Sequence, residues 1–212
     1  MDPAWYASLF PKVAGKQCVV YKCVVEDSVE KFDSWLDTSY SNHGHRAYNL
    51  VGAPTSSREY SGATLTQAAN SVCSKVGADS SKGKAYFGCV CIPERHTSKG
   101  NENANMARKV NMGCEWFITQ GIYSEGAIIK LLNDYGDDCK AAKIVPKKVM
   151  LTFAPCGRPK TLTFIKWLGM FVPPEVEERI IGAKDPVNES VELCCELLGK
   201  ILQATHASGV RI

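Results

Sequence analysis

The stretch CEWFITQGIYS, residues 114–124, decides the fold class of this chain. Its aromatic and β-branched run, Trp116 to Ile118, predicts a strand that enters a hydrophobic core. The run then stops at a threonine and at Gln120, and Gly121 follows where the chain must turn. An amide at this place has two interpretations: it caps the backbone of the next helix, or it faces a ligand where the strand ends.

Apolar runs on both sides of this stretch also predict short strands, and amphipathic segments separate them. The five predicted strands cover residues 17–25, 46–52, 84–93, 114–120 and 147–155. The predicted helices cover residues 26–40, 64–78, 101–113, 124–136, 159–169, 173–183 and 188–209, and residues 210–212 are interpreted as the start of a sixth strand. Because nearly continuous apolar strands alternate with helices and no hairpin signal joins them, the pattern predicts an α/β fold with a parallel sheet covered by helices.

Capping residues predict where several of these helices begin and end. Asp27 or Ser28 is expected to cap the first helix, and Asn188 or Ser190 to lie near the start of the last. The expected helix stops are Gly77, Gly113 and Gly136. A glycine suits a helix end because it adopts the left-handed conformation without strain.

The chain has 212 residues, which favours a single domain. Residues 1–16 precede the first predicted strand and are interpreted as an N-terminal extension, so the predicted domain covers residues 17–212. An open doubly wound sheet and a (β/α)8 barrel both fit a pattern of parallel strands. A complete barrel needs eight strands and about 250 residues, and this chain shows only five or six strands.

Composition argues against several classes of partner. Apolar residues make up 45% of the chain and charged residues 22%, the balance of a soluble globular protein. The net charge is only +3, without a basic block interleaved with aromatics, so no nucleic-acid partner is expected. No apolar run approaches the roughly 20 residues needed to span a bilayer, so no membrane partner is expected either. The first residues lack the pattern of a signal peptide, which indicates a cytoplasmic protein.

The ten cysteines are interpreted as reduced thiols of the core. They are scattered from Cys18 to Cys195, and no Cys-x-x-Cys pair occurs. Disulfides are rare in cytosolic proteins, and buried thiols behave as small hydrophobic groups. His43 and His45 lie in a loop before a strand and lack a third ligand, so no metal site is expected there.

In both parallel architectures, functional residues gather where the strands end. The residues expected there are Glu94, Arg95 and His96 after the third strand, Thr119 and Gln120 after the fourth, and Cys156 and Arg158 after the fifth. Taken singly, Glu94 and His96 are also typical of a solvated polar loop, and Lys109 is typical of an exposed helix lysine. Neither a Gly-x-Gly-x-x-Gly fingerprint nor a P-loop occurs, which disfavours a Rossmann cofactor site and a nucleotide P-loop.

Two segments, CIPERH (residues 91–96) and ARKVNMGCEWFITQGIYS (residues 107–124), resemble the central signature of the methylenetetrahydrofolate reductases. In that family a Tyr-Pro-Glu-x-His segment at a strand end precedes a helix with Lys-Val-x-x-Gly and a strand that ends in Ile-Thr-Gln. The segment NLVGAP (residues 49–54) is similar to the family's Leu-Arg-Gly-Asp turn. Residues 151–180 and 192–212 resemble its later strand and helices, so the similarity extends from about residue 17 to the last residue.

The resemblance implies a (β/α)8 TIM barrel with FAD at the carboxyl ends of the strands, of which this chain supplies about six of eight βα units. Gly52, His96 and Lys109 match residues that bind FAD in that family, and a lysine suits its diphosphate. Gln120 matches the glutamine that hydrogen-bonds the pterin ring of folate, and Tyr123 lies in the aromatic segment that packs on folate or nicotinamide. The implied reaction transfers a hydride from NAD(P)H to FAD and then to methylenetetrahydrofolate.

Departures from the family pattern bear on catalysis. Val51 and Ala53 replace the arginine and the aspartate of the Leu-Arg-Gly-Asp turn, and Val20 replaces a histidine. The family's catalytic glutamate has no counterpart in residues 1–16, so no catalytic residue is assigned. Two functions follow: a flavin-dependent reductase of one-carbon metabolism, or a catalytically impaired relative that binds flavin, folate or a partner protein. A third interpretation is a different α/β enzyme that shares only these motifs, and a second copy or a partner chain is a candidate to complete the barrel.

Overall fold

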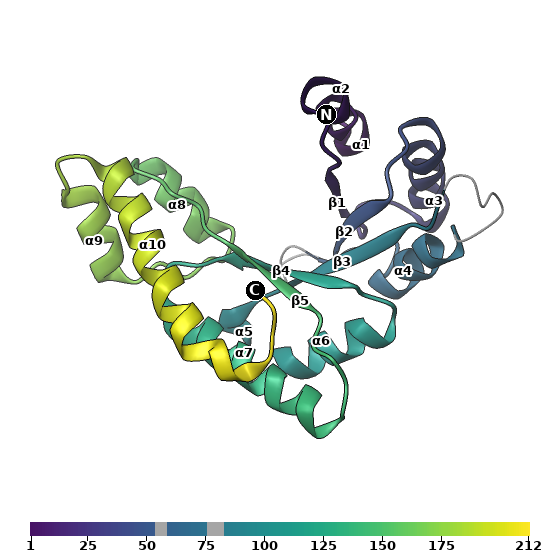
Figure 1. Cartoon of the computed structure of the whole chain (residues 1–212). Helices are drawn as coiled ribbons and strands as arrows, with labels where there is room; N and C mark the ends of the chain where they lie inside the picture. The colour runs from purple at the N-terminus through teal and green to yellow at the C-terminus, as the bar shows by residue number, and fades with distance from the viewer. Residues whose placement is uncertain (54–58, 76–82) are drawn as a thin grey trace. The chain divides into compact units, whose positions relative to one another are not determined.

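The computed structural model of this chain describes residues 1–53, 59–75 and 83–212 (Figure 1). It is an α/β fold whose sheet has five strands in the order β1-β2-β3-β4-β5. The strands are β1 (Val19–Cys23), β2 (Ala47–Val51), β3 (Tyr86–Cys91), β4 (Trp116–Gly121) and β5 (Lys148–Thr152). β1 pairs with β2, and β2 with β3, in parallel. The five predicted strands and the parallel α/β class are therefore confirmed.

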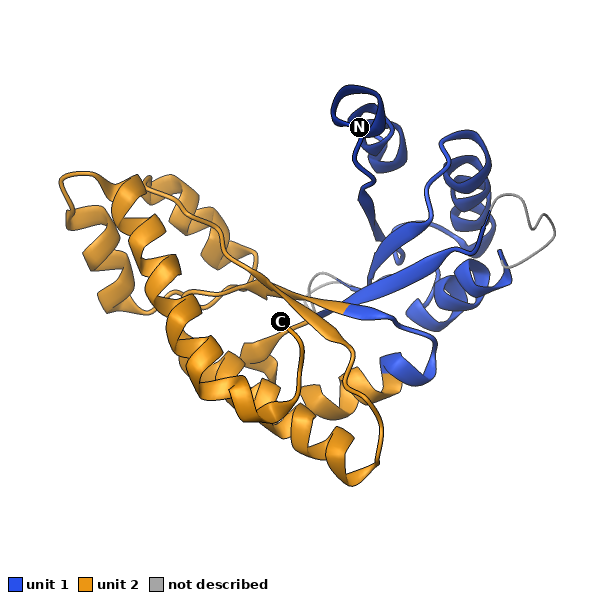
Figure 2. Cartoon of the chain, in the orientation of Figure 1, with its two compact units in different colours: residues 1–90, 109–116 blue, residues 91–108, 117–212 orange. Residues whose placement is uncertain are grey.

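The chain forms two compact units, each of which is described by itself (Figure 2). Unit 1 consists of residues 1–90 and 109–116, and unit 2 consists of residues 91–108 and 117–212. The chain passes from one unit to the other within β3, within β4 and within α6 (Glu102–Asn111). Each unit therefore contains strands, helices and a share of the predicted site residues.

Unit 1 contains the helices α1 (Pro3–Ala7), α2 (Leu9–Ala14), α3 (Val29–Asp37) and α4 (Leu65–Ser74), the π-helical turn η1 (Thr38–Asn42), β1, β2 and most of β3. Helix α3 begins after Ser28, whose hydroxyl accepts a hydrogen bond from the Lys31 N–H, as the capping pattern predicted. Thr64 and Gln67 form a capping box at the start of α4. Gly77, the expected stop of this helix, lies outside the described residues. Helix α4 packs on β2 and on α3.

The N-terminal extension folds into α1 and α2, two helices that the sequence analysis did not predict. Two side-chain contacts attach α1 to the rest of unit 1. The indole Nε1 of Trp35 donates a hydrogen bond to the Asp2 carboxylate at 2.9 Å, and His45 Nε2 lies 2.9 Å from the Ala4 carbonyl oxygen. His45 therefore has a structural contact, and the described part of the chain holds no group of three or more His, Cys, Asp or Glu side chains able to bind a metal.

One face of the unit 1 strands is buried, whereas the other is only partly covered. Val20 and Tyr48, on the first face, are at most 1% exposed. On the opposite face Val19, Tyr21 and Tyr86 are 37%, 45% and 43% exposed. The prediction that helices cover the sheet thus holds for one face of these strands and fails for the other.

Trp116 lies directly against the backbone of Gly88 in unit 1. A Cβ atom at Gly88 would lie 2.0 Å from the indole Nε1 of Trp116, so a larger residue does not fit without movement of the indole. This Nε1 atom is buried and has no hydrogen-bond partner in the described ranges. Asn49, the register partner of Gly88 in β2, is fully buried, and within the same ranges its amide has no partner either. Such groups are uncommon in folded proteins, because a buried polar group without a partner is costly.

Unit 2 contains most of α6, β4 and β5, and its remaining elements are α5 (Pro93–Lys99), α7 (Glu125–Ala141), α8 (Pro159–Trp167), α9 (Pro174–Gly182), α10 (Pro186–Thr205) and the 3-10 turn η2 (His206–Ser208). A hydrophobic core that includes Tyr123, Leu162, Ile180 and Leu197 joins the end of β4 to α8, α9 and α10. Helix α10 packs along α7 and against α9. The β4–α7 connection is therefore held from several sides.

Two sequence predictions for unit 2 are wrong in detail. Helix α7 does not end at Gly136 but continues past it. Helix α10 begins after Asp185, whose carboxylate accepts a hydrogen bond from the Asn188 N–H, so Asn188 lies near the helix start as predicted. Residues 93–99, interpreted as a polar loop, form α5, since a proline at the first helical position loses no hydrogen bond that the helix needs.

The sheet is open in the described residues, with β1 and β5 as its outer strands. Residues 210–212 are not a strand, although the Val149 N–H in β5 donates a hydrogen bond to the Arg211 carbonyl at 2.9 Å. The barrel character of the predicted incomplete (β/α)8 fold is therefore not confirmed, and the sixth strand is wrong. Within the same ranges, none of the helices combines the length and the apolar character needed to cross a bilayer.

Candidate functional site

Gln120 lies near the carboxyl end of β4, where the sequence analysis placed a ligand contact. Its Nε2 donates a hydrogen bond to the carbonyl of Leu168, just after α8, at 3.0 Å. Among the described residues its Oε1 has no hydrogen-bond partner. The amide therefore does not cap the next helix: it binds the end of α8 and keeps one acceptor and one N–H for another group.

Tyr123 follows in the connection from β4 to α7 and is only 1% exposed. Its hydroxyl donates a hydrogen bond to the carbonyl of Ala154, which follows β5. Burial is the first cause that raises the pKa of this phenol above its ordinary value, so the group stays protonated at neutral pH. The hydrogen bond and the surrounding core fix the ring in one position.

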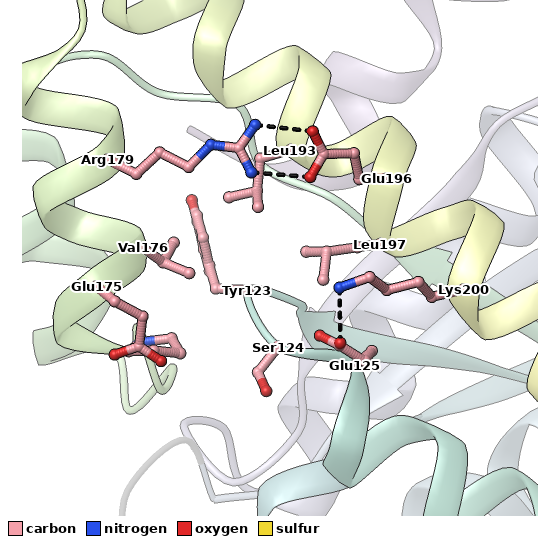
Figure 3. A pocket seen from close by; sticks show the side chains of 11 residues that line it. Tyr123, Ser124, Glu125, Glu175, Val176, Arg179, Leu193, Glu196, Leu197 and Lys200 are labelled. Carbon is pink, nitrogen blue, oxygen red and sulfur yellow. Dashed lines mark hydrogen bonds and ion pairs between the residues drawn. The ribbon is translucent and has the colours of Figure 1, made fainter.

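A pocket of about 360 Å³ lies beside Tyr123 and is formed entirely within unit 2 (Figure 3). Its apolar wall includes Tyr123, Val176, Leu193 and Leu197. Its charged side chains are Glu125, Glu175, Arg179, Glu196 and Lys200. The volume is near the lower end of the range of about 300–1,000 Å³ that is typical of small-molecule sites.

Both cations of the pocket are already paired with carboxylates. Two nitrogens of Arg179 donate to the Glu196 carboxylate at 2.8 Å each, and its Nε donates to Glu189 at 2.6 Å. Lys200 Nζ donates to Glu125 at 2.9 Å. Hydrogen bonds from these cations lower the pKa values of Glu196 and Glu125 below their ordinary values. These pairs are partly exposed, so each contributes little to stability but defines the charge of the pocket.

His96 lies in α5 and is 2% exposed. Its Nε2 is 2.7 Å from Oδ2 of Asp134 in α7, and Lys130 Nζ donates to the same oxygen at 2.5 Å. Hydrogen bonds from Lys130 and then from His96 lower the pKa of Asp134 below its ordinary value. The Nδ1 atom of His96 is buried and has no hydrogen-bond partner in the part of the chain that the structure describes, so the contact that the structure shows for this ring joins α5 to α7.

Lys109 and Gly52 belong to unit 1. Lys109 is 7% exposed, and its Nζ donates a hydrogen bond to the Val90 carbonyl at 2.7 Å, so its interpretation as an exposed helix lysine is wrong. Gly52 follows β2, and among the described residues no heavy atom lies within 4 Å of the position that its Cβ would occupy.

The three residues that the resemblance assigns to FAD are divided between the units: Gly52 and Lys109 belong to unit 1, and His96 belongs to unit 2. His96 and Lys109 hold protein partners, and Ala53 supplies no carboxylate. FAD binding by Gly52, His96 and Lys109 stays a prediction. In unit 2, Gln120 lies near the end of β4 and Tyr123 lies in the connection that follows, where it lines the wall of a pocket.

Several residues around this connection were not singled out by the sequence analysis. They are Asp134, Glu175, Arg179, Glu196 and Lys200. Each is a charged residue on a helix, and such residues are usually solvated. Apart from Lys130, four positions from Asp134, the hydrogen-bond partners of Asp134, Arg179, Glu196 and Lys200 lie 10 to 75 positions away along the chain, a separation that periodicity does not reveal. No local signal in the sequence distinguishes them from other exposed charges.

No protein-family model matches the chain, and no curated protein matches it significantly. Solved structures do match. One is an uncharacterized protein from Clostridium thermocellum, described as binding two copies of 5-methyl-5,6,7,8-tetrahydrofolic acid, with a TM-score of 0.83 and 28% sequence identity. The match covers 100% of this chain and 70% of that protein's chain. This similarity is consistent with the folate-related fold that the resemblance implied.

Proposed function

We propose that this chain binds a reduced folate, such as 5-methyltetrahydrofolate. One observation carries the proposal: over its whole length the chain resembles, in fold and in sequence, a protein that binds two copies of this compound. The motif around Gln120 supports it independently, because that motif resembles the folate-binding strand of the methylenetetrahydrofolate reductases. The proposal concerns binding and does not depend on a redox reaction.

The proposed contact is the Gln120 amide at the end of β4. A pterin ring offers neighbouring hydrogen-bond donors and acceptors, and the free Oε1 and second N–H of Gln120 complement that pattern. The bond from Gln120 to the Leu168 carbonyl orients the amide before a ligand arrives. An oriented amide loses less conformational entropy on binding than a mobile one.

Isothermal titration calorimetry with 5-methyltetrahydrofolate tests this proposal. We expect binding by the wild type, and weaker binding by Gln120→Ala, by roughly twofold to tenfold at that site, since about one net hydrogen bond is lost. Gln203→Ala, an exposed glutamine in α10, is the control and should bind like the wild type. The melting temperature of each variant separates a lost contact from a lost fold. A wild-type protein that releases no binding heat with any reduced folate would refute the proposal.

Flavin-dependent reduction is the second candidate, favoured by the resemblance of the segments that contain His96 and Lys109. Ala53 argues against it, because an alanine does not supply the acid that the family uses at that turn. We expect folate binding without NAD(P)H oxidation. A rise in melting temperature with FAD, together with menadione reduction by NADPH that is lost in His96→Ala, would instead support the reductase.

The finer architecture belongs to the same proposal. We propose that the five βα units are part of a (β/α)8-type barrel in a cytoplasmic protein, completed by a second copy or by a partner chain. The open face with Val19, Tyr21 and Tyr86 supports this, since parallel sheets normally bury both faces. Light scattering during size-exclusion chromatography reports the oligomeric state.

A further inference from the structure

We propose that the pocket beside Tyr123 is a second binding site, which takes the pterin ring of a reduced folate, with Glu175 as the residue that recognises the ring. This inference rests on the proposed function but concerns residues other than Gln120. It depends on three features of the pocket: its charge, its apolar wall and its size.

Glu175 differs from the other charged residues of the pocket because it has no hydrogen-bond or ion-pair partner among the described residues. Glu125 and Glu196 are hydrogen-bonded to Lys200 and Arg179, whereas Glu175 makes no hydrogen bond or ion pair with any residue in the described ranges. Figure 3 shows Glu175 at the α9 side of the pocket, away from both ion pairs. The pocket therefore presents two unoccupied acceptor oxygens and no unoccupied cation.

This charge pattern selects the ring of folate rather than its tail. The 2-amino group and the N3–H of a pterin are adjacent donors on one edge, and a carboxylate accepts both, as it does from the fork of an arginine. The glutamate tail carries carboxylates, which would be repelled by Glu175 and would find both cations already paired. The tail is therefore expected to extend into solvent.

The apolar wall and the volume fit the same ligand. Tyr123, Val176, Leu193 and Leu197 give the pocket an aromatic and aliphatic lining, in which Tyr123, Leu193 and Leu197 are at most 5% exposed and Val176 is the more accessible contact for a flat ring. The hydroxyl of Tyr123 is held by the Ala154 carbonyl, so the aromatic ring is in place before binding. A volume of about 360 Å³ suits a bicyclic ring better than an entire folate.

The first measurement is the stoichiometry of 5-methyltetrahydrofolate by calorimetry, with the full chain and three variants. We expect two sites in the wild type. Glu175→Gln should weaken one of them by roughly tenfold to hundredfold, since a charge-assisted pair of hydrogen bonds is lost. Glu178→Gln removes the same charge from the same helix outside the pocket lining and should leave both sites unchanged. Val176→Phe should weaken the same site by filling the pocket, after circular dichroism has shown that it folds.

The second measurement separates the parts of the ligand. We expect 6-methyltetrahydropterin to compete for the Glu175-dependent site in wild type and in Gln120→Ala, and p-aminobenzoylglutamate not to compete. Benzamidine binding that depends on Glu175, without pterin binding, would identify a site for organic cations and overturn the inference. Two unchanged sites in both Glu175→Gln and Val176→Phe would also overturn it, while the proposed folate binding at Gln120 would stand. If calorimetry finds a single folate site, and only Gln120→Ala weakens it, the inference is overturned and the proposed folate binding at Gln120 stands.

Discussion

At the scale of the residue, the contact between His96 and Asp134 shows how a motif residue can serve the fold. The buried imidazole and the Lys130 ammonium share one carboxylate oxygen of Asp134. Both donors favour the ionised carboxylate, which lowers its pKa. A carboxyl group whose pKa is lowered on folding stabilises the protein above its unfolded-state pKa, and this contribution is lost as the pH falls through the folded-state value.

We therefore predict that Asp134→Asn lowers the free energy of unfolding at pH 7 by about 1–2 kcal/mol, because charge-assisted hydrogen bonds to His96 and Lys130 are weakened. The difference from wild type should shrink as the pH falls below about 4, the ordinary pKa of an aspartate in the unfolded chain, and on through the lower pKa of Asp134 in the folded protein. Urea unfolding followed by circular dichroism at several pH values measures both effects. Asp137→Asn, an exposed position on the same helix, is the control. A difference that is constant from pH 7 to pH 3 would contradict the assigned role.

Predictions for single residues succeeded where the interacting partner lies nearby in the sequence, and they failed where the partner lies far away along the chain. Ser28 caps α3 because its partner is three residues away, within one turn, and the sequence contains that signal. His96 and Asp134 are 38 positions apart, so only the folded chain brings them together. Gln120 was expected to cap the next helix or to meet a ligand, whereas its donor binds the end of α8.

At the scale of the element, helix α7 explains why one predicted boundary is wrong. Gly136 was expected to end the helix, but α7 runs through it. The reason is a close approach: a Cβ at Gly136 would lie 2.3 Å from the carbonyl oxygen of Ser208, in the turn after α10. A sequence pattern does not distinguish a glycine that ends a helix from a glycine that allows another segment to pack closely on the helix.

This approach predicts opposite effects for two Gly→Ala substitutions in helix interiors. Gly136→Ala should lower the free energy of unfolding by about 1–3 kcal/mol, because the new methyl group collides with the Ser208 backbone. Gly199→Ala should raise it by about 0.5–1 kcal/mol, because no atom lies within 4 Å of the added methyl and alanine favours helix. Chemical denaturation of both variants and of the wild type measures these free energies of unfolding. If Gly136→Ala were as stable as Gly199→Ala, the packing of the terminal turn on α7 would be wrong.

Element type was otherwise predictable to a large extent, because apolar periodicity is a local property of the chain. All five strands and the main helices follow it. The sequence analysis did not predict three short helices. Helix α1 is attached by contacts to Trp35 and His45, and α2 follows it directly. Helix α5 has a polar sequence that is typical of a loop. The prediction of a sixth strand was wrong because residues 210–212 make only one backbone hydrogen bond to β5, from the Val149 N–H to the Arg211 carbonyl, within the described residues.

At the scale of the whole molecule, the ten cysteines differ in how deeply they are buried. Six are buried, Cys18 and Cys23 are partly exposed, and Cys73 and Cys195 are exposed. Burial is the first cause that raises the pKa values of the Cys156 and Cys194 thiols, which lowers the fraction of reactive thiolate. The interpretation of most cysteines as reduced core thiols agrees with this distribution.

We predict that a thiol reagent such as Ellman's reagent modifies two cysteines rapidly at pH 8 and all ten only after denaturation. Cys73→Ser should remove one of the two rapid reactions, because Cys73 is exposed. The time course of absorbance at fixed reagent concentration gives the number of rapidly reacting thiols in the wild type and in Cys73→Ser. Rapid modification of six or more thiols in the native protein would show that the cores are more open than described.

The candidate site was predictable only in part at this scale. The segment with Gln120 and Tyr123 was identified because its residues are contiguous in the sequence. The charged residues of the pocket come from α7, α9 and α10, and nothing local relates one helix to the next.

The packing of Trp116 on Gly88 also gives the protein a built-in optical probe. An indole whose N–H is buried and lacks a partner emits at shorter wavelength than a hydrated one, whereas Trp5 and Trp167 are 49% and 77% exposed. Iodide in solution would quench the exposed pair first and leave the emission of Trp116 and of the partly buried Trp35. In a Trp35→Phe variant the residual blue fluorescence would then follow the pairing of strands β3 and β4 during unfolding, without any label attached to the chain.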